Sequence, residues 1–246
     1  MRLKGKTALV TGAGSGFGAG IARKFAAEGA RVLAVDLNGD AAQAVAVEIG
    51  GQALAADVAD GAQVRAMAQA AVAAFGRIDI LVNNAGVTQL PGPMEEISEA
   101  DFDRVFRVNA KSVYLTARHL VPAMKHRRGG VILNIASTAG LSPRPRLSWY
   151  NASKGWMITA TRTMAVELAP FRIRVNALCP VAGETPLLRS FLGEDTPEIR
   201  AKFLATIPLG RFSTPRDIGQ AAAFLCSDAA EMLTGVALEV DGGRCI

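Results

Sequence analysis

Three side chains of this sequence have types and a spacing that could move a proton. Tyr150 and Lys154 are four positions apart, and Ser137 lies thirteen positions before Tyr150. In a helix the phenol and the ammonium would lie one turn apart on the same face. An ammonium within about 4–6 Å lowers the pKa of a phenol, ordinarily about 10, by roughly 1–3 units. We therefore expect Tyr150 to act as a general acid and base, with Ser137 donating a hydrogen bond to the oxygen that exchanges the proton.

An exposed Tyr and Lys on an ordinary helix would have the same spacing. Whether the pair is catalytic therefore depends on the elements that surround it. Short apolar runs alternate with helical patterns along the whole chain, which favours βαβ units and a parallel sheet covered on both faces. The expected strands are 7–10, 31–36, 52–56, 78–82, 131–136, 173–178 and 236–240, and the expected helices are 16–28, 40–49, 61–75, 101–126, 150–168 and 215–226. No linker divides the chain, so one domain over residues 1–246 is predicted, with residues 185–214 as a mobile substrate lid.

A glycine-rich turn follows the first expected strand. Gly12, Gly16 and Gly18 have the spacing Thr-Gly-x-x-x-Gly-x-Gly, with Ser15 and Phe17 between them. Such glycines let a backbone approach a pyrophosphate closely at the N-terminus of a helix, as in Rossmann folds. A tight turn between a strand and a helix also needs glycine for purely structural reasons. The turn alone is therefore weak evidence for a dinucleotide site.

Asp36 strengthens that interpretation. It ends the second expected strand, twenty positions after Gly16, where a carboxylate can accept hydrogen bonds from both ribose hydroxyls of a dinucleotide. The same charge would repel a 2′-phosphate, and Leu37 and Asn38 supply no basic side chain to offset it. The sequence thus predicts NAD in preference to NADP. The structural alternative is an acidic turn residue at a strand end.

Composition argues against several other classes of protein. The 246 residues carry a formal charge of +5, with the basic residues scattered, so no nucleic-acid partner is expected. Three cysteines without C-x-x-C spacing and only two histidines argue against a disulfide framework, a metal site and a Ser-His-Asp hydrolase. No apolar run approaches the roughly 20 residues that span a bilayer, and the start of the chain does not resemble a signal peptide. We expect no membrane partner and a cytoplasmic location.

Taken together, the glycine-rich turn, Asn83-Asn84-Ala85-Gly86, Ser137 and Tyr150-x-x-x-Lys154 occur in an order and at separations that resemble the short-chain dehydrogenase/reductase family. The resemblance covers nearly the whole chain, and the motifs are specific jointly although not singly. It implies a Rossmann-type doubly wound α/β domain with a seven-stranded parallel sheet of order 3-2-1-4-5-6-7. It also implies hydride transfer between a nicotinamide and a carbinol or carbonyl carbon.

The family's residue roles carry over to matching positions of this chain. Tyr150 would be the acid/base, Ser137 would orient the substrate oxygen, and Lys154 would lower the tyrosine pKa and hold the nicotinamide ribose. Asn109 would place a water in a proton relay that ends at Lys154. The remaining implied cofactor contacts are Asp57 and Val58 at the adenine, Asn84, Ala85 and Gly86 beside the ribose, and Pro180, Gly183 and Thr185 at the carboxamide.

One position departs from the family pattern. Pro180 and Thr185 keep the usual spacing, but Val181 stands where glycine is usual, and a glycine appears at position 183 instead. A β-branched residue cannot adopt every backbone conformation open to glycine. The path of the backbone through residues 181–183 is therefore left open by the sequence.

The function expected from these features is NAD(H)-dependent oxidation of a secondary alcohol or reduction of a ketone. The alternative within the family is a 3-oxoacyl carrier-protein reductase, which is similar in length and layout but commonly uses NADPH. A Rossmann methyltransferase would have no use for Ser137, Tyr150 and Lys154. A non-catalytic nucleotide-binding scaffold would normally have lost one of these three, and none is lost.

The resemblance also implies a homotetramer in which the helices at 101–126 and 148–168 pair across a two-fold axis. Phe106, Val113, Trp156 and Met157 offer apolar side chains on these helices, some of which must face the chain's own sheet. For the substrate, Arg144 between Pro143 and Pro145, with Arg189 and Arg211 of the lid, could bind an anionic group. The alternative is that these arginines face solvent or pair with Glu184, Glu194 or Asp195.

Overall fold

Seven parallel strands form one continuous sheet in the computed structural model, which describes residues 1–246. The strand order is β3-β2-β1-β4-β5-β6-β7, which confirms the predicted topology. The strands are β1 (Thr7–Thr11), β2 (Arg31–Asp36), β3 (Gln52–Ala55), β4 (Ile80–Asn83), β5 (Gly130–Ile135), β6 (Ile173–Pro180) and β7 (Ala237–Val240). The order reverses between β1 and β4, the switch point at which ligands bind in open parallel sheets.

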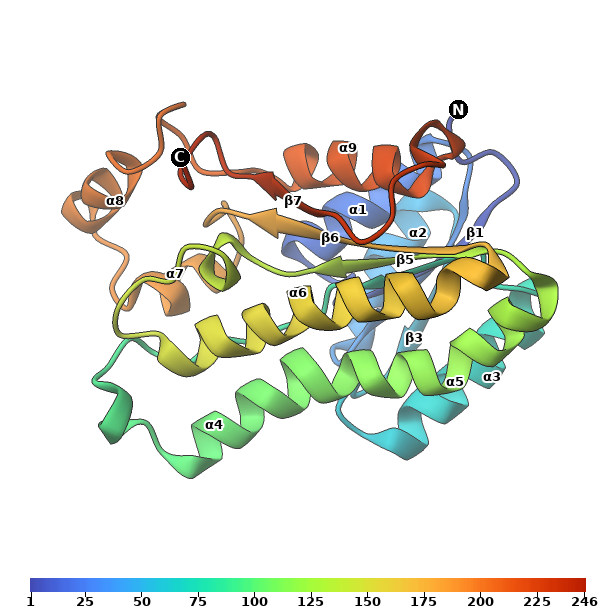
Figure 1. The fold of residues 1–246 in the computed structure, drawn as a ribbon, viewed down its shortest axis with the longest axis horizontal. Coiled ribbons are helices and arrows are strands. Elements are labelled where there is room, and N and C mark those ends of the chain that lie inside the picture. Colours follow the sequence, from blue (N-terminus) through green and yellow to red (C-terminus); the bar gives the residue numbers. More distant parts are fainter.

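Nine α-helices connect and cover these strands (Figure 1). They are α1 (Gly16–Ala27), α2 (Gly39–Ile49), α3 (Gly61–Phe75), α4 (Glu99–Phe106), α5 (Ser112–Arg127), α6 (Ser148–Leu168), α7 (Leu187–Leu192), α8 (Pro197–Leu204) and α9 (Pro215–Cys226). Short 3₁₀ turns lie at Met94–Glu96, Thr138–Gly140, Ala169–Phe171 and Asp228–Ala230. No helix is both long and apolar enough to cross a membrane.

Successive residues of each strand enter different cores, because side chains alternate across a sheet. Ala8 and Val10 pack with α1, α2 and α9 on one face, whereas Leu9 packs with α3, α5 and α6 on the other. Both faces are therefore apolar, which explains why the strand sequences are apolar throughout rather than alternating. Figure 1 shows α1 and α9 on one side of the sheet and α5 and α6 on the other.

The helix expected over 101–126 is interrupted by a π-helical segment, Arg107–Lys111, between α4 and α5. A π turn places one extra residue in the helix and is frequently found at functional sites. The sequence analysis did not predict this insertion, because the chain is helical on both sides of it and was interpreted as one continuous helix.

The segment at 185–214 contains α7 and α8, which lie at one end of the molecule (Figure 1). Five residues of this expected lid are nevertheless buried. Leu188, Phe191, Leu192, Ile207 and Phe212 are buried in a separate apolar cluster that also contains Tyr150, Leu147 and Val181. The segment is therefore packed directly against the start of α6.

Two of the four side chains expected at a subunit interface face inward. Val113 and Met157 are each 1% exposed and pack near β5 and β6. They lie on the stripe of α5 and α6 that covers the chain's own sheet. Trp156 is 40% exposed, and Phe102 of α4 and Tyr114 of α5 add further exposed aromatic surface.

Candidate active site

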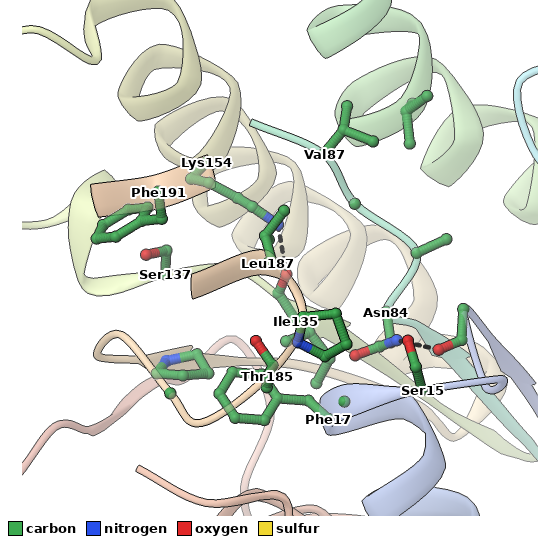
Figure 2. Close-up of a pocket in the computed structure, with 18 of the residues that line it drawn as sticks. Ser15, Phe17, Asn84, Val87, Ile135, Ser137, Lys154, Thr185, Leu187 and Phe191 are labelled. Carbon is green, nitrogen blue, oxygen red and sulfur yellow. Dashed lines mark hydrogen bonds between the residues drawn. The ribbon is translucent and has the colours of Figure 1, made fainter. Parts of the chain in front are cut away.

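A cavity of about 370 Å³ lies at the carboxyl ends of the central strands. Figure 2 shows Ser15, Phe17, Asn84, Ser137, Lys154 and Thr185 around it. Its walls bring together most of the residues that the sequence analysis selected: Gly12, Ser15, Gly16, Phe17, Asp36, Asp57, Val58, Asn84, Ala85, Gly86, Ser137, Tyr150, Lys154, Pro180, Gly183 and Thr185. Asn109 and Gly18 do not line the cavity but support residues that do.

The glycine-rich turn folds tightly enough to leave room for a phosphate. Gly12 has a φ of +63°, and a Cβ at Gly18 would overlap the carbonyl oxygen of Gly12. Ser15, which precedes α1, makes no side-chain cap, so the first amides of that helix have no side-chain partner. Amides at a helix N-terminus bind anions well. This end of the cavity therefore fits a pyrophosphate.

Asp36 lies beside the same turn. Its Oδ2 accepts a 2.9 Å hydrogen bond from the amide of Gly14, and its Oδ1 accepts one of 3.0 Å from the amide of Asn38. The carboxylate still lines the cavity, and each oxygen can accept a second hydrogen bond. The position fits recognition of a ribose diol.

Asn84 joins the ends of β1 and β4. Its Nδ2 donates to the carbonyl oxygens of Thr11 at 2.9 Å and Gly12 at 3.1 Å. The amides of Asn84 and Ala85 both donate to the hydroxyl of Thr11. The two loops that border the switch point are thus fixed relative to each other.

Lys154 lies in the interior, 4% exposed, on the α6 turn after Tyr150. Its Nζ donates a 2.8 Å hydrogen bond to the carbonyl oxygen of Ile135 at the end of β5. The Nζ lies 5.9 Å from the centre of the Tyr150 ring. Burial lowers the pKa of Lys154 to about 8, because the charged form loses hydration, while Cys179 acts in the opposite direction.

The pKa of Tyr150 differs from the sequence prediction. Burial of the phenol raises it above its ordinary value, while the Ser137 hydroxyl and the positive charge of Arg144 act to lower it. The predicted lowering by Lys154 is not found, and the ammonium donates to Ile135 instead of to the phenol. In the protein alone, desolvation therefore outweighs the stabilisation of the phenolate.

Asn109 occupies the π-helical segment and is completely buried. Its side chain exchanges two hydrogen bonds of 2.9 Å with the backbone of Val87 and donates one of 3.0 Å to the Ser153 hydroxyl. A Cβ at Gly86 would lie 3.4 Å from both Asn109 Oδ1 and Lys154 Nζ. The structure thus brings Asn109 and Lys154 close to the same glycine. The side chain of Asn109 fixes the loop after β4.

The backbone through residues 181–183 takes a definite path. Val181 extends from β6, and its side chain is buried in the cluster that contains Tyr150 and Phe191. Gly183 forms an isolated parallel bridge with Ser213, and a Cβ at this position would overlap the ring of Phe17. The glycine at 183 is therefore required by close packing against Phe17 in the first turn of α1.

The lid arginines do not form the ion pairs considered from the sequence. Arg200, not Arg189 or Arg211, pairs with Glu184 and Asp195. Arg211 pairs with Asp217 of α9. Arg144 has no carboxylate partner, and its guanidinium stacks on Phe191, with 4.6 Å between its central carbon and the ring centre.

Sequence reasoning missed two features that position Tyr150. Gln89 is buried, and its Oε1 accepts a 3.1 Å hydrogen bond from the Tyr150 amide at the uncapped start of α6. Phe191 packs edge-on against the Tyr150 ring, with 5.8 Å between the ring centres. Neither residue belongs to a motif or a periodic pattern that would have identified it.

A polar network crosses the interior beneath the site. Thr116 of α5 donates to Asn83, Asn83 donates to Asn134, and Asn134 donates to Thr161 of α6, each at 2.8 Å. All four side chains are buried. The network fixes α5 and α6 against β4 and β5, which carry Asn84 and Ser137 at their ends.

Comparison with known proteins agrees with this geometry. Residues 12–244 match the family model described as enoyl-(acyl carrier protein) reductase. The chain is 49% identical to 4-formylbenzenesulfonate dehydrogenase of Comamonas testosteroni over the full length of both chains. It is 42% identical to D-threitol dehydrogenase of Mycolicibacterium smegmatis, over 100% of this chain and 95% of the relative.

Solved structures show the same fold. A 3-ketoacyl-(acyl-carrier-protein) reductase of Brucella melitensis, complexed with NADH, is 51% identical, and the match covers 99% of this chain and 100% of the other with a TM-score of 0.94. These matches extend over the sheet, the glycine-rich turn and the cavity described above. The chain belongs to the short-chain dehydrogenase/reductase family, whose members use a nicotinamide cofactor.

Proposed function

We propose that this protein is an NAD(H)-dependent oxidoreductase that interconverts a secondary alcohol and a ketone, with Tyr150 as the acid/base. The observation that carries the proposal is the meeting of Ser137, Tyr150 and Lys154 on one cavity that also reaches the glycine-rich turn and Asp36. A nicotinamide dinucleotide, when bound, supplies the hydride acceptor for oxidation and a positive ring that favours the phenolate. The relatives named as dehydrogenases support the reaction class.

In oxidation, the Tyr150 phenolate accepts the hydroxyl proton of the substrate as the carbon loses its hydride. Ser137 donates a hydrogen bond to the same oxygen and holds it beside the phenol. Lys154 places a buried positive charge near the ring, and its pKa of about 8 allows it to exchange protons near neutral pH. In reduction the Tyr150 hydroxyl returns the proton to the oxygen.

Asp36 supports NAD as the cofactor, because its carboxylate lines the cavity, its charge would repel a 2′-phosphate, and Leu37 and Asn38 supply no basic side chain. The related Brucella structure contains NADH, which is consistent with this preference. A second candidate function is the reduction of a 3-oxoacyl group on a carrier protein. That candidate is favoured by the same solved relative, which is named as a 3-ketoacyl-(acyl-carrier-protein) reductase.

The decisive variant is Tyr150→Phe. We expect kcat to fall by at least about 10²–10⁴-fold, the usual loss when a general acid/base is removed. Binding of NADH, followed by its fluorescence, should be retained, since the ring still fills the same space. A panel of secondary alcohols with NAD, and of ketones and a 3-oxoacyl thioester with NADH, separates the two candidate functions. Near-native turnover by Tyr150→Phe would refute the assignment.

A further inference from the structure

Two arginines far apart in the sequence lie over one aromatic ring of the lid. Arg144 precedes α6, Arg244 follows β7, and the ring is that of Phe203 on α8. The central guanidinium carbons lie 5.5 Å (Arg144) and 5.4 Å (Arg244) from the centre of this ring. Arg144 also lies over Phe191, at 4.6 Å. The fold thus brings two positive charges to one small aromatic cluster.

Neither Arg144 nor Arg244 has a carboxylate within ion-pair distance, unlike Arg200 of the lid. Arg200 pairs with Glu184 and Asp195 in the same region. Arg144 makes one side-chain hydrogen bond, to the carbonyl oxygen of Phe191 at 3.2 Å, although a guanidinium carries five donors. Arg244 makes none that the structure records.

The carboxylate nearest to Arg244 in the sequence is already used. Asp241 accepts hydrogen bonds from the amides of Gly243 at 2.9 Å and Cys245 at 2.8 Å. It therefore stabilises the turn that carries Arg244 rather than neutralising its charge. The turn places the arginine over the lid.

This arrangement is electrostatically unfavourable in the protein alone. Arg144 is half-buried, and its pKa is lowered by that burial and further by the positive charge of Arg244. Partial desolvation of a charge without an opposite charge nearby disfavours the folded state. An anion within reach of both guanidinium groups would compensate both charges.

The arginines lie one aromatic ring away from the reacting groups. Phe191 lines the cavity and contacts Tyr150 edge-on, and its ring also carries the Arg144 guanidinium. Figure 2 shows Phe191 near Ser137 at the same end of the cavity. Neither arginine lines the cavity itself, so a substrate whose reacting carbon lies at Tyr150 must extend past Phe191 to reach them.

We propose that Arg144 and Arg244 form an anion-binding site for a carboxylate or sulfonate group of the substrate, held about one aromatic ring from the carbon that reacts. This inference rests on the proposed oxidoreductase function and specifies its substrate class. The competing explanation is that the arginines only stack on Phe191 and Phe203 to hold α7 and α8 in place.

The kinetic test compares 4-(1-hydroxyethyl)benzenesulfonate, 4-(1-hydroxyethyl)benzoate and the neutral 1-phenylethanol, each with NAD. The proteins are the native enzyme, Arg244→Gln, Arg144→Gln and a control, Arg65→Gln, which removes an exposed and unpaired arginine from α3. We expect kcat/KM of the native enzyme to favour the anionic alcohols by at least about tenfold, which one charge-assisted contact can supply. Arg244→Gln should remove most of that preference by raising KM for the anionic alcohols. Its kcat/KM for 1-phenylethanol should stay within about threefold of native, and so should kcat/KM of Arg65→Gln for all three alcohols.

Equal losses for charged and neutral substrates in Arg244→Gln and Arg144→Gln would overturn the proposal, as would an unchanged preference. A second measurement needs no turnover and so fails independently of the proposed function. Calorimetric titration with 4-sulfobenzoate at fixed ionic strength should detect binding to the native protein and to Arg65→Gln, and at least about tenfold weaker binding to Arg244→Gln. Equal affinity in all three proteins would exclude the anion site whether or not an alcohol is oxidised.

Discussion

The carboxylate of Asp36 accepts a hydrogen bond of 2.9 Å from the backbone amide of Gly14, across the glycine-rich turn. One side chain at the end of β2 therefore both fixes the turn after β1 and presents a negative charge to the cavity. A predicted cofactor contact and an observed structural contact are combined in the same group. Substitutions of Asp36 must separate the two effects.

We expect native kcat/KM to be much higher with NAD than with NADP. At an effective dielectric near 20, a carboxylate about 4 Å from a phosphate charge costs up to about 4 kcal/mol, and a third of that is roughly tenfold in affinity. Asp36→Ala should lower the ratio of kcat/KM with NAD to kcat/KM with NADP by at least about tenfold. It should also weaken the binding of both cofactors, because the Gly14 amide loses its hydrogen-bond acceptor. Asp36→Asn, which keeps one acceptor oxygen, should narrow the ratio with a smaller loss of NAD binding. Equal kcat/KM for the two cofactors in the native enzyme would contradict this prediction.

The burial of Lys154 should appear as a pH dependence of stability. Its pKa is about 8 in the folded protein and near 10.5 in the unfolded chain, so the unfolded chain binds more protons between these values. The buried charge destabilises the fold most fully below pH 8, and this penalty is lost as the pH rises. We therefore compare the free energy of unfolding of the native protein with that of Lys154→Met. The difference, native minus variant, should increase between pH 8 and 9.5 by up to about 1.4 kcal/mol per pH unit.

Urea denaturation at pH 7, 8, 9 and 9.5 measures this difference, and Lys202→Met, at an exposed position of α8, serves as the control. The range stops below pH 10 because the pKa of Tyr150 is raised in the folded protein. Above pH 10 the tyrosine would ionise more readily in the unfolded chain, which lowers the free energy of unfolding and would oppose the effect of Lys154. A difference that stays flat over the whole range would show that Lys154 is not desolvated as described.

The buried polar network can be tested with two threonines of α6. Thr161 and Thr163 each donate to a carbonyl oxygen one turn earlier in their own helix, but only Thr161 also accepts from the buried Asn134. Thr161→Val should lower the free energy of unfolding by about 1–3 kcal/mol, because Asn134 Nδ2 is left without a partner. Thr163→Val, at an exposed position, should change it by less than about 0.5 kcal/mol. Similar effects of both variants on urea denaturation would argue against the network.

The exposed aromatic surface of α4, α5 and α6 should be buried between subunits. Phe102, Tyr114 and Trp156 are 37%, 50% and 40% exposed. We expect a tetramer, or failing that a dimer, in light scattering at micromolar concentration. Trp156→Glu should shift the population to smaller species, since a charge would enter an apolar interface. Met232→Glu, at a position that is 89% exposed after α9, should leave the assembly unchanged. A monomeric native protein would contradict the prediction.

Local sequence determined the framework of this protein. The apolar strands at 31–36 and 173–178 and the helices between strands required a sheet covered on both faces, and the structure has that sheet. Gly12 and Ser137 could be placed from the sequence because residues that follow the carboxyl ends of parallel strands converge on one edge of the sheet. Side-chain type and spacing were sufficient for these features. Burial on both faces of a parallel sheet and the period of a helix each produce a pattern that can be recognised within a short stretch of sequence.

Tertiary structure alone decided the electrostatics and the shape of the substrate end. The sequence predicted a lowered pKa for Tyr150, but the direction depends on burial and on which group the Lys154 ammonium bonds, and both are set by long-range packing. Arg144 and Arg244 are one hundred positions apart and come near the same ring only because Phe203 of α8 lies close to both the loop before α6 and the turn after β7. No local periodicity encodes such a contact, because it depends on the relative placement of three separate elements.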